Sequence, residues 1–292
     1  MTSAGRSTQR QLAWVLPLAI FTLCVQKSWA GETPSPSDHT DWIDSTFAKI
    51  QQADGLTAPQ IISDSTFLRR SHLDLLGTIP SVAVTRDFLA DKDANKRERL
   101  IETLLADRKH AQNLARVWRR ALIPPGSPGE QLAVGVEPWL RNQFSANTPY
   151  DDMVRSLLSV KSSQNSTTEI SALSFYRAAG GNAEGVADAV TRTFLGVRLS
   201  CAKCHDHPFA DWKQEEFWGV AAFFSGVRNG SVTDVKLTKI LATDSDVEYP
   251  ARFLWAEAPA EIKKNQFPRE AFANWLTSGS NPNFAATTVN RV

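Results

Sequence analysis

The chain has 292 residues, 42% of them apolar, and its 32 basic residues nearly balance its 31 acidic ones. This composition excludes a disordered or fibrous chain. The balanced charge gives no long-range attraction to nucleic acid or to an anionic membrane surface. We therefore expect a globular protein that does not bind nucleic acid, with a length that suits one large or two small domains.

The N-terminal 30 residues have the pattern of a secretory signal peptide. Arg6 and Arg10 precede an apolar run over residues 12–25, and residues 28–30 supply small side chains at the two positions that a signal peptidase recognises. The run of about 14 residues is short for a membrane span, so an uncleaved anchor is only the second interpretation. Cleavage removes three basic residues (Arg6, Arg10 and Lys27) from 32 and leaves 29 against 31 acidic ones, a net charge of about −2. We expect an exported protein, in the periplasm or at the cell surface, with no transmembrane span after cleavage.

The mature chain is expected to be mainly helical over its first part. Residues 31–40, rich in Pro, Ser and Thr, form a predicted flexible leader. After it, residues 41–160 form the N-terminal helical part, because apolar residues recur there at helical spacing. The segments with this spacing are 41–52, a stripe from Phe67 that ends at Gly77, a helix opened by Pro80-Ser81, 97–106, 111–122, 139–144 and 150–160.

A second part, residues 161–230, contains the most informative motif of the chain. It starts with a polar loop over residues 161–169, and Asn182 is a suitable N-cap for a helix that continues to Leu199. Asp211 and Gln214 have the spacing of a capping pair for a further helix. Residues 231–292 follow as an appendage with short strands or irregular structure and a helix over residues 269–276.

The motif is Cys201-Ala202-Lys203-Cys204-His205, a C-x-x-C-H run between two predicted helices. This run is typical of covalent c-type haem attachment. Two thiols three positions apart can each add to one vinyl group of a porphyrin, and the following imidazole can reach the iron. Because the third cysteine, Cys24, falls within the predicted signal peptide, no other cysteine is left in the mature chain. We predict haem c bound through Cys201 and Cys204, with His205 as an axial ligand of the iron.

Two other interpretations of the cysteine pair stay open. The two thiols could form a disulfide in an oxidising compartment, although no βαβ pattern of a thioredoxin-like motif surrounds them. A zinc site could use both cysteines with His205 and His207. Structural zinc sites usually take their second ligand pair from a distant segment, so four ligands within seven residues would be cramped.

The second axial ligand decides whether such a haem would transfer electrons or bind a small molecule. His207 is too close to His205 in the sequence to reach the opposite face of the same iron. Met153, the single methionine left after cleavage, lies in an apolar helical stripe and is the preferred candidate. The other histidines, His39, His72 and His110, are weaker candidates.

Two stretches resemble a known family. FLRRSHLDLLGTIPS (residues 67–81) and FLGVRLSCAKCHDHPFADWKQEEFWGVAAFF (residues 194–224) are similar to the DUF1549 family, also called the planctomycete cytochrome type 2 domain. The resemblance covers most of the chain from Asp41 to about Val227 and implies a mainly helical domain with a haem c site at Cys201, Cys204 and His205. It implies no reaction.

The last stretch, FPREAFANWLTSGSNPNFAATTVNRV, resembles the start of the DUF1553 domain that commonly follows DUF1549. Because the sequence stops at Val292 within an apolar segment, with no residues that typically end a helix, we expect a truncated or split version of a longer protein, with a helical surface left uncovered. A monomeric, soluble and cooperatively folding product would contradict this expectation.

These features lead to two hypotheses of function. The first is an exported c-type cytochrome-like protein with an electron-transfer or redox-sensing role and a redox partner protein. The second is a non-redox binding or scaffold module at the cell surface, in which the cysteine pair is a structural disulfide or a metal site. An enzyme is a third interpretation, but the carboxylate pairs Asp151-Asp152 and Glu215-Glu216 do not assemble a nucleophile, base and orienting group from spacing alone.

Overall fold

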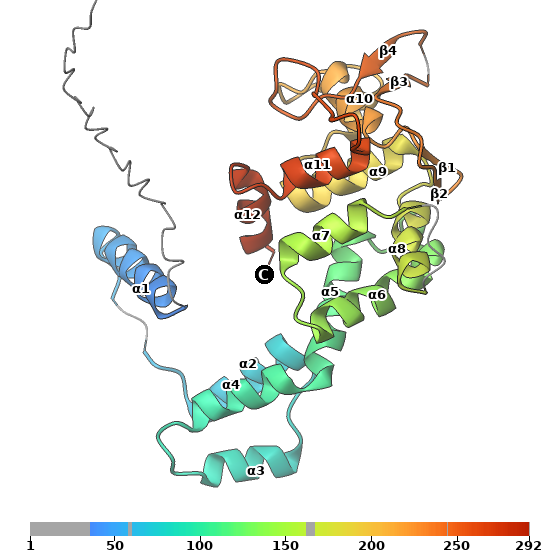
Figure 1. The fold of residues 1–292 in the computed structure, drawn as a ribbon. Coiled ribbons are helices and arrows are strands. Elements are labelled where there is room, and N and C mark those ends of the chain that lie inside the picture. Colours follow the sequence, from blue (N-terminus) through green and yellow to red (C-terminus); the bar gives the residue numbers. More distant parts are fainter. Residues whose placement is uncertain (1–35, 58–59, 162–166, 244, 292) are drawn as a thin grey trace, which may run out of the picture. The chain divides into compact units, whose positions relative to one another are not determined.

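The structure is a computed structural model that describes residues 36–57, 60–161, 167–243 and 245–291. The predicted signal peptide lies outside these residues. The chain divides into two compact units, residues 1–61 and residues 62–292. The described residues are mainly helical, with a few short strands near the C-terminus, which confirms the predicted fold class at this level (Figure 1). None of the helices in the described ranges combines the length and the apolar character that a membrane crossing needs.

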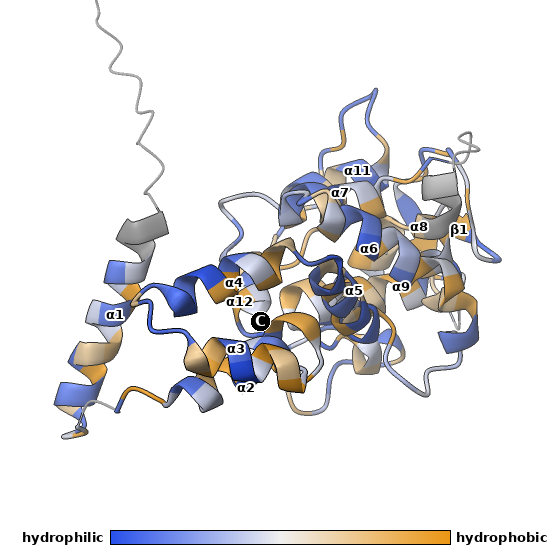
Figure 2. Cartoon of the chain, turned by 90° about the horizontal axis from the view of Figure 1, so that it is seen from below, coloured by the Kyte–Doolittle hydropathy of each residue, from blue (hydrophilic) through white to orange (hydrophobic). Residues whose placement is uncertain are grey.

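The first unit contains one helix, α1 (Pro36–Ala53). It begins before the predicted start at Asp41, so residues 36–40 belong to the helix and not to the predicted leader. Apolar residues lie among hydrophilic ones along α1 (Figure 2). The side chains of Trp42, Phe47 and Ile50 are at least half exposed, which leaves an apolar face on this helix.

The second unit begins with helices whose capping residues set their bounds. The Ser63 hydroxyl accepts a hydrogen bond from the amide of Thr66, and the Ser81 hydroxyl accepts one from the amide of Val84, each at 3.3 Å. Gly77, at φ 70°, ends the first of these helices as predicted. The elements of this part are α2 (Asp64–Leu76), α3 (Val82–Ala90), α4 (Lys96–Ala106), α5 (Arg108–Leu122), the 3₁₀ helix η1 (Glu130–Gly135), α6 (Val136–Ser145) and α7 (Tyr150–Leu158).

The second half of this unit differs from the prediction in two places. A helix, α8, begins at Thr167 within the predicted polar loop, and the helix expected to continue to Leu199 ends at Leu195. It ends there because Gly196 adopts a left-handed φ of 70°. The helices are α8 (Thr167–Ala178), α9 (Ala183–Val190), the π-helical turn η2 (Thr191–Leu195), the 3₁₀ turn η3 (Ser200–Lys203), α10 (Gln214–Ala222), α11 (Pro268–Leu276) and α12 (Pro282–Val289).

Two antiparallel hairpins lie between α10 and α11 in the sequence. The strand β1 (Val227–Arg228) pairs with β2 (Ser231–Val232), and β3 (Lys239–Leu241) pairs with β4 (Glu248–Pro250). These strands fall in or next to the segments that were expected to be short strands or irregular structure. The second hairpin packs on α10.

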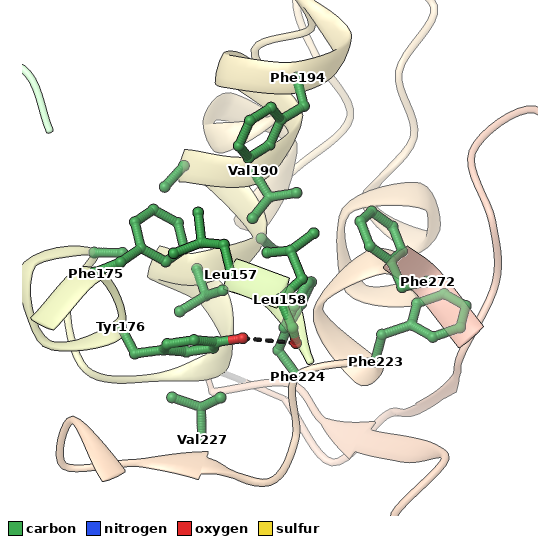
Figure 3. Packing of buried hydrophobic residues seen from close by; sticks show 14 of the residues in the cluster. Leu157, Leu158, Phe175, Tyr176, Val190, Phe194, Phe223, Phe224, Val227 and Phe272 are labelled. Carbon is green, nitrogen blue, oxygen red and sulfur yellow. Dashed lines mark hydrogen bonds between the residues drawn. The ribbon is translucent and has the colours of Figure 1, made fainter. Parts of the chain in front are cut away.

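The hydrophobic core of the second unit is built from α5 to α12 and contains many fully buried aromatic residues. Figure 3 shows Phe175, Phe194, Phe223 and Phe272 packed around the leucines of α7. The hydroxyl of Tyr176 donates a hydrogen bond of 2.8 Å to the carbonyl of Leu158 within this core. This bond satisfies a polar group that would otherwise be costly to bury. The core therefore gives α9 and α10, which flank the motif, a fixed support.

Candidate functional site

The C-x-x-C-H motif lies on the short 3₁₀ turn η3 and the residues directly after it. Cys201 and Cys204 are free thiols and both are exposed. Ala202, between them, is fully buried and packs in the hydrophobic core. The turn is thus anchored by its small apolar residue, while both sulfur atoms are left accessible to a reaction partner.

Side chains of α10 hold the motif turn by one carbonyl group. The carbonyl of Lys203 accepts hydrogen bonds from the indole Nε1 of Trp218 at 3.1 Å and from Nε2 of Gln214 at 3.0 Å. Trp218 itself is only 1% exposed. Because a buried indole rarely leaves its N–H unpaired, this bond fixes the position of the turn relative to α10.

The imidazole of His205 is exposed and its orientation is set by a backbone bond. Its Nδ1 lies 2.7 Å from the carbonyl oxygen of Asp206. A carbonyl can only accept, so Nδ1 carries the hydrogen and Nε2 of the neutral ring keeps its lone pair. Metal-binding histidines are usually oriented in this way. Two accessible thiols and an imidazole with a free Nε2 on one turn form the donor set that covalent haem c attachment requires.

Asp206 connects the motif to the start of α10. Its carboxylate accepts from the amide of Gln214 at 2.9 Å and from Nζ of Lys213 at 3.1 Å. The backbone hydrogen bond from Gln214, followed by the bond from Lys213, holds the pKa of the Asp206 carboxyl below its usual value. The predicted capping pair of Asp211 and Gln214 is therefore wrong. Asp206 reaches the first turn of α10, and Glu216 accepts from the amide of Lys213 at 2.8 Å.

The loop after the motif exposes an aromatic side chain that the sequence analysis did not single out. The amide of His207 donates to the carbonyl of Trp212 at 2.8 Å, which closes the loop. The Nδ1 of His207 accepts from the amide of Phe209 at 3.1 Å. Phe209 is 94% exposed, so a large apolar surface lies four residues after His205. Only its position in a short polar loop could have indicated this exposure.

Met153 does not lie on the same exposed surface as the motif. It belongs to α7, is 3% exposed and packs in the hydrophobic core. Helix α7 packs against α11 (Figure 1), whereas the motif turn packs against α10. A bond from the Met153 sulfur to an iron held by exposed His205 would require the core to open locally. The sixth ligand stays a prediction.

The other histidines named as weaker ligands make backbone hydrogen bonds. Nδ1 of buried His72 donates to the carbonyl of Leu68 at 3.0 Å, and Nδ1 of His110 donates to the carbonyl of Leu75 at 3.1 Å. The first bond lies within α2, and the second joins α5 to α2. The side chain of His39 lies outside the described residues.

The carboxylate pairs considered for catalysis are engaged in ion pairs and caps. Arg155 contacts Asp151 at 2.5 Å and Asp152 at 2.8 Å, and Arg252 contacts Glu215 at 3.0 Å. Within the described ranges, no group of three or more His, Cys, Asp or Glu side chains has an arrangement suited to a metal ion. These carboxylates therefore have structural partners that account for their positions.

Comparison with known proteins identifies the family. No curated protein and no solved structure matches the chain. The resemblance of the C-terminal stretch to DUF1553 lies beyond the residues that a family model matches and stays a prediction. Residues 42–229 match the family model PSCyt2, described as a protein of unknown function (DUF1549), and this range includes the whole motif. The chain therefore belongs to the DUF1549 family.

Proposed function

We propose that this chain is an exported c-type cytochrome-like protein that binds haem and has an electron-transfer or redox-sensing role. The observation that carries the proposal is the donor set on one turn: two exposed free thiols and an imidazole whose Nδ1 is tied to a carbonyl. The thiols need no rearrangement of the core to react, because only Ala202 of the turn is buried.

Each residue of the motif has a distinct role in this proposal. Cys201 and Cys204 hold the porphyrin by thioether bonds, and Nε2 of His205 is the proximal ligand. The bound haem supplies one-electron chemistry. Asp206 keeps the carbonyl that orients His205 in place through its own bonds to Gln214 and Lys213. Because covalent attachment of haem takes place outside the cytoplasmic membrane, the proposal includes export by the N-terminal signal and a redox partner in the same compartment.

A haem stain on a denaturing gel tests the proposal. The full chain is produced in a host with a working haem-attachment system, and the double variant C201S/C204S is the matched control. We expect wild type to retain the stain after denaturation and the control to lose it, since serine forms no thioether. The variant H205A should keep the stain but change the reduced-minus-oxidised spectrum, because the proximal ligand is lost.

Absence of covalent haem in wild type would overturn the proposal. Titration of the thiols would then separate the remaining alternatives. A pair that is oxidised after purification from the periplasm would favour the non-redox binding or scaffold module with a structural disulfide. Thiols that release zinc on modification would favour a metal site.

Substitution of Met153 tests the proposed electron-transfer coordination. In the haem-loaded protein, Met153→Ala should remove the sulfur-to-iron charge-transfer band of the ferric spectrum if Met153 is the sixth ligand. Because the side chain is 3% exposed, the change should in any case destabilise the fold by about 2–5 kcal/mol through the cavity it leaves. Loss of stability with an unchanged spectrum would show that Met153 is a packing residue and not a ligand.

A further inference from the structure

A second candidate site lies beside the second β-hairpin, in a cavity of about 460 Å³. Its walls come from three places: the loop before α9, the β1–β2 hairpin and the strand β3. Figure 1 shows β1 and β2 near α9, and β3 and β4 beside α10. The volume is in the range typical of ligand pockets, roughly 300–1,000 Å³. None of the motif residues Cys201, Cys204 and His205 lines this cavity.

The backbone of β3 has one unpaired edge. The carbonyl of Thr238 accepts from the amide of Ala251 at 2.7 Å, and the amide of Ala242 donates to the carbonyl of Val247 at 3.1 Å. The backbone groups of Thr238, Ile240 and Ala242 therefore point toward β4. The backbone N–H and C=O groups of successive residues point to opposite edges of a strand in an antiparallel pair. The groups of Lys239 and Leu241 therefore point away from β4. In the described residues the sheet has two strands only, so this edge has no strand partner.

The unpaired edge faces the cavity. Leu237, two residues before Lys239, points its carbonyl to the same side, where it accepts from the hydroxyl of Ser225 at 3.1 Å. Ser225, Leu237, Lys239 and Leu241 all line the cavity. The loop around Gly181 also lines the cavity, and it packs closely on the β1–β2 hairpin, since a side chain on Gly181 would lie 2.9 Å from the amide nitrogen of Gly230. Beyond Leu237, whose carbonyl is bonded to Ser225, the edge over Lys239 and Leu241 thus borders a hollow space.

The charged side chains around the cavity indicate which charge a ligand should carry. Nζ of Lys239 pairs with Glu248 at 2.9 Å, and the carboxylate of Glu184 accepts from the hydroxyl of Thr243 at 2.7 Å. Arg228, which is exposed, makes no ion pair with any of the described residues. An acidic side chain on the ligand would give this guanidinium a partner, and charge-assisted bonds of this kind are the strong ones.

We propose that this cavity binds an extended peptide segment, which adds as a strand to the open edge of β3 and places an acidic side chain at Arg228. Strand addition gives affinity through backbone hydrogen bonds and specificity through alternate side chains. Lys239 and Leu241 are two residues apart, which in an extended strand is about 6.6 Å. An added strand repeats its backbone hydrogen-bonding groups at the same spacing. The inference is independent of haem attachment at the motif.

Binding of the purified chain to an array of linear decapeptides tests the proposal. Every second residue of each peptide is Thr or Val in turn, so these side chains share one face of the extended peptide. On the other face, one central residue is Glu in one set and Lys in the matched set. We expect the Glu set to bind and the Lys set to bind at least about tenfold more weakly. Arg228→Ala should abolish this preference.

Two substitutions at Leu241 distinguish an effect on peptide binding at the edge from an effect on the stability of the fold. Leu241→Pro removes an N–H that does not pair with β4 and projects a ring from the edge, whereas Leu241→Ala keeps the N–H. We expect the Pro variant to bind at least about tenfold more weakly than wild type and the Ala variant to bind like wild type. Hydrogen exchange gives a second readout, in which a bound peptide should slow exchange of the Lys239 and Leu241 amides.

The proposal is overturned if no peptide binds, if Leu241→Pro binds as well as Leu241→Ala, or if the acidic preference survives in Arg228→Ala. A concentration-dependent dimer that Leu241→Pro abolishes, without peptide binding, would also overturn it. That result would make the edge an interface between copies of this chain. Thermal unfolding of each variant shows whether the fold is retained. In wild type mixed with peptide, fast hydrogen exchange of the Lys239 and Leu241 amides would contradict the proposal independently of the variants.

Discussion

Arg269 is the most buried charged side chain of the described residues, at 3% exposure. Its guanidinium donates to the carbonyl of Val160 at 3.0 Å and to that of Thr233 at 3.2 Å, and Asp234 lies 3.8 Å away. These groups come from the end of α7 and from the segment after β2. One side chain on α11 thus joins segments that are far apart in the sequence.

Replacing Arg269 by Met should destabilise the second unit by about 3 kcal/mol, because the buried carbonyl of Val160 and the partly buried carbonyl of Thr233 would lose a charged donor. Urea unfolding monitored by circular dichroism measures the change, which should lower the midpoint without a large change in slope. The control Arg120→Met, at an exposed position of α5, should change stability by no more than about 0.5 kcal/mol. Equal effects of the two changes would contradict the structural role of Arg269.

The phenol of Tyr150 should ionise at a higher pH than an exposed tyrosine. It packs between Trp118 at 5.0 Å and Phe284 at 5.2 Å between ring centres, and burial raises the pKa of its phenol from 10.0 to about 12. Since the folded-state pKa lies above the unfolded one, the neutral phenol contributes stability below pH 10, and this is lost as the pH rises toward 12. The absorbance titration of wild type minus that of Tyr150→Phe should show one phenol ionising near pH 12. A difference curve with its midpoint near 10 would contradict the burial of this ring.

The residues of the C-x-x-C-H motif could be identified from the sequence because the pattern is local. Cys201, Cys204 and His205 are adjacent, so their spacing alone identifies the motif. The groups that orient them could not be found in this way. Trp218 reaches Lys203 across 15 residues, and this contact depends on how α10 packs on the turn. The mistaken cap at Asp211 has the same origin, since Asp206 reaches Gln214 only in the folded loop.

At the scale of elements, the predictions succeeded where one helix face is polar and failed where the helix is buried or broken. Helix α2 was recognisable by its end at Gly77 and α3 by its start at Ser81. Helix α8 was missed because its buried residues, such as Phe175 and Tyr176, lack the contrast of an amphipathic pattern. The apolar spacing up to Leu199 gave no sign that the backbone would turn at Gly196.

Gly196→Ala should disturb the approach to the motif. The residue has φ 70°, and an added Cβ would lie 3.1 Å from the hydroxyl of Thr287 on α12. A left-handed non-glycine residue costs about 1–2 kcal/mol, and the contact adds to this. The matched control is Gly279→Ala, where the space is open and φ is not positive, so its effect should be small. Thermal unfolding compares the two, and equal melting temperatures would contradict this account of the turn.

At the scale of the whole molecule, the two units differ in what they bury. The buried apolar side chains of the described residues begin at Leu68, so all of them belong to the second unit. Helix α1 belongs for the most part to the matched family domain, yet its Trp42 and Phe47 are exposed. The hydrophobic core thus accounts for the fold from residue 62 onward.

A chain that starts at Ile62 should therefore unfold with nearly the stability of the longer chain, within about 0.5 kcal/mol, since no buried apolar residue is removed. Urea denaturation of both chains, monitored by tryptophan fluorescence, provides the comparison. A loss of several kcal/mol, or loss of cooperativity, in the shorter chain would show that α1 is needed for folding.

The accessibility of the motif has a consequence for how the protein would mature. Cys201 and Cys204 are exposed while Ala202 between them is buried, and the turn is attached to α10 through one carbonyl group. If the chain binds haem as proposed, an attachment enzyme could reach both sulfur atoms in the folded protein, so modification would not have to precede folding. The apoprotein would then be a folded substrate for attachment, and the supply of haem, not the rate of folding, would limit the yield of the mature form.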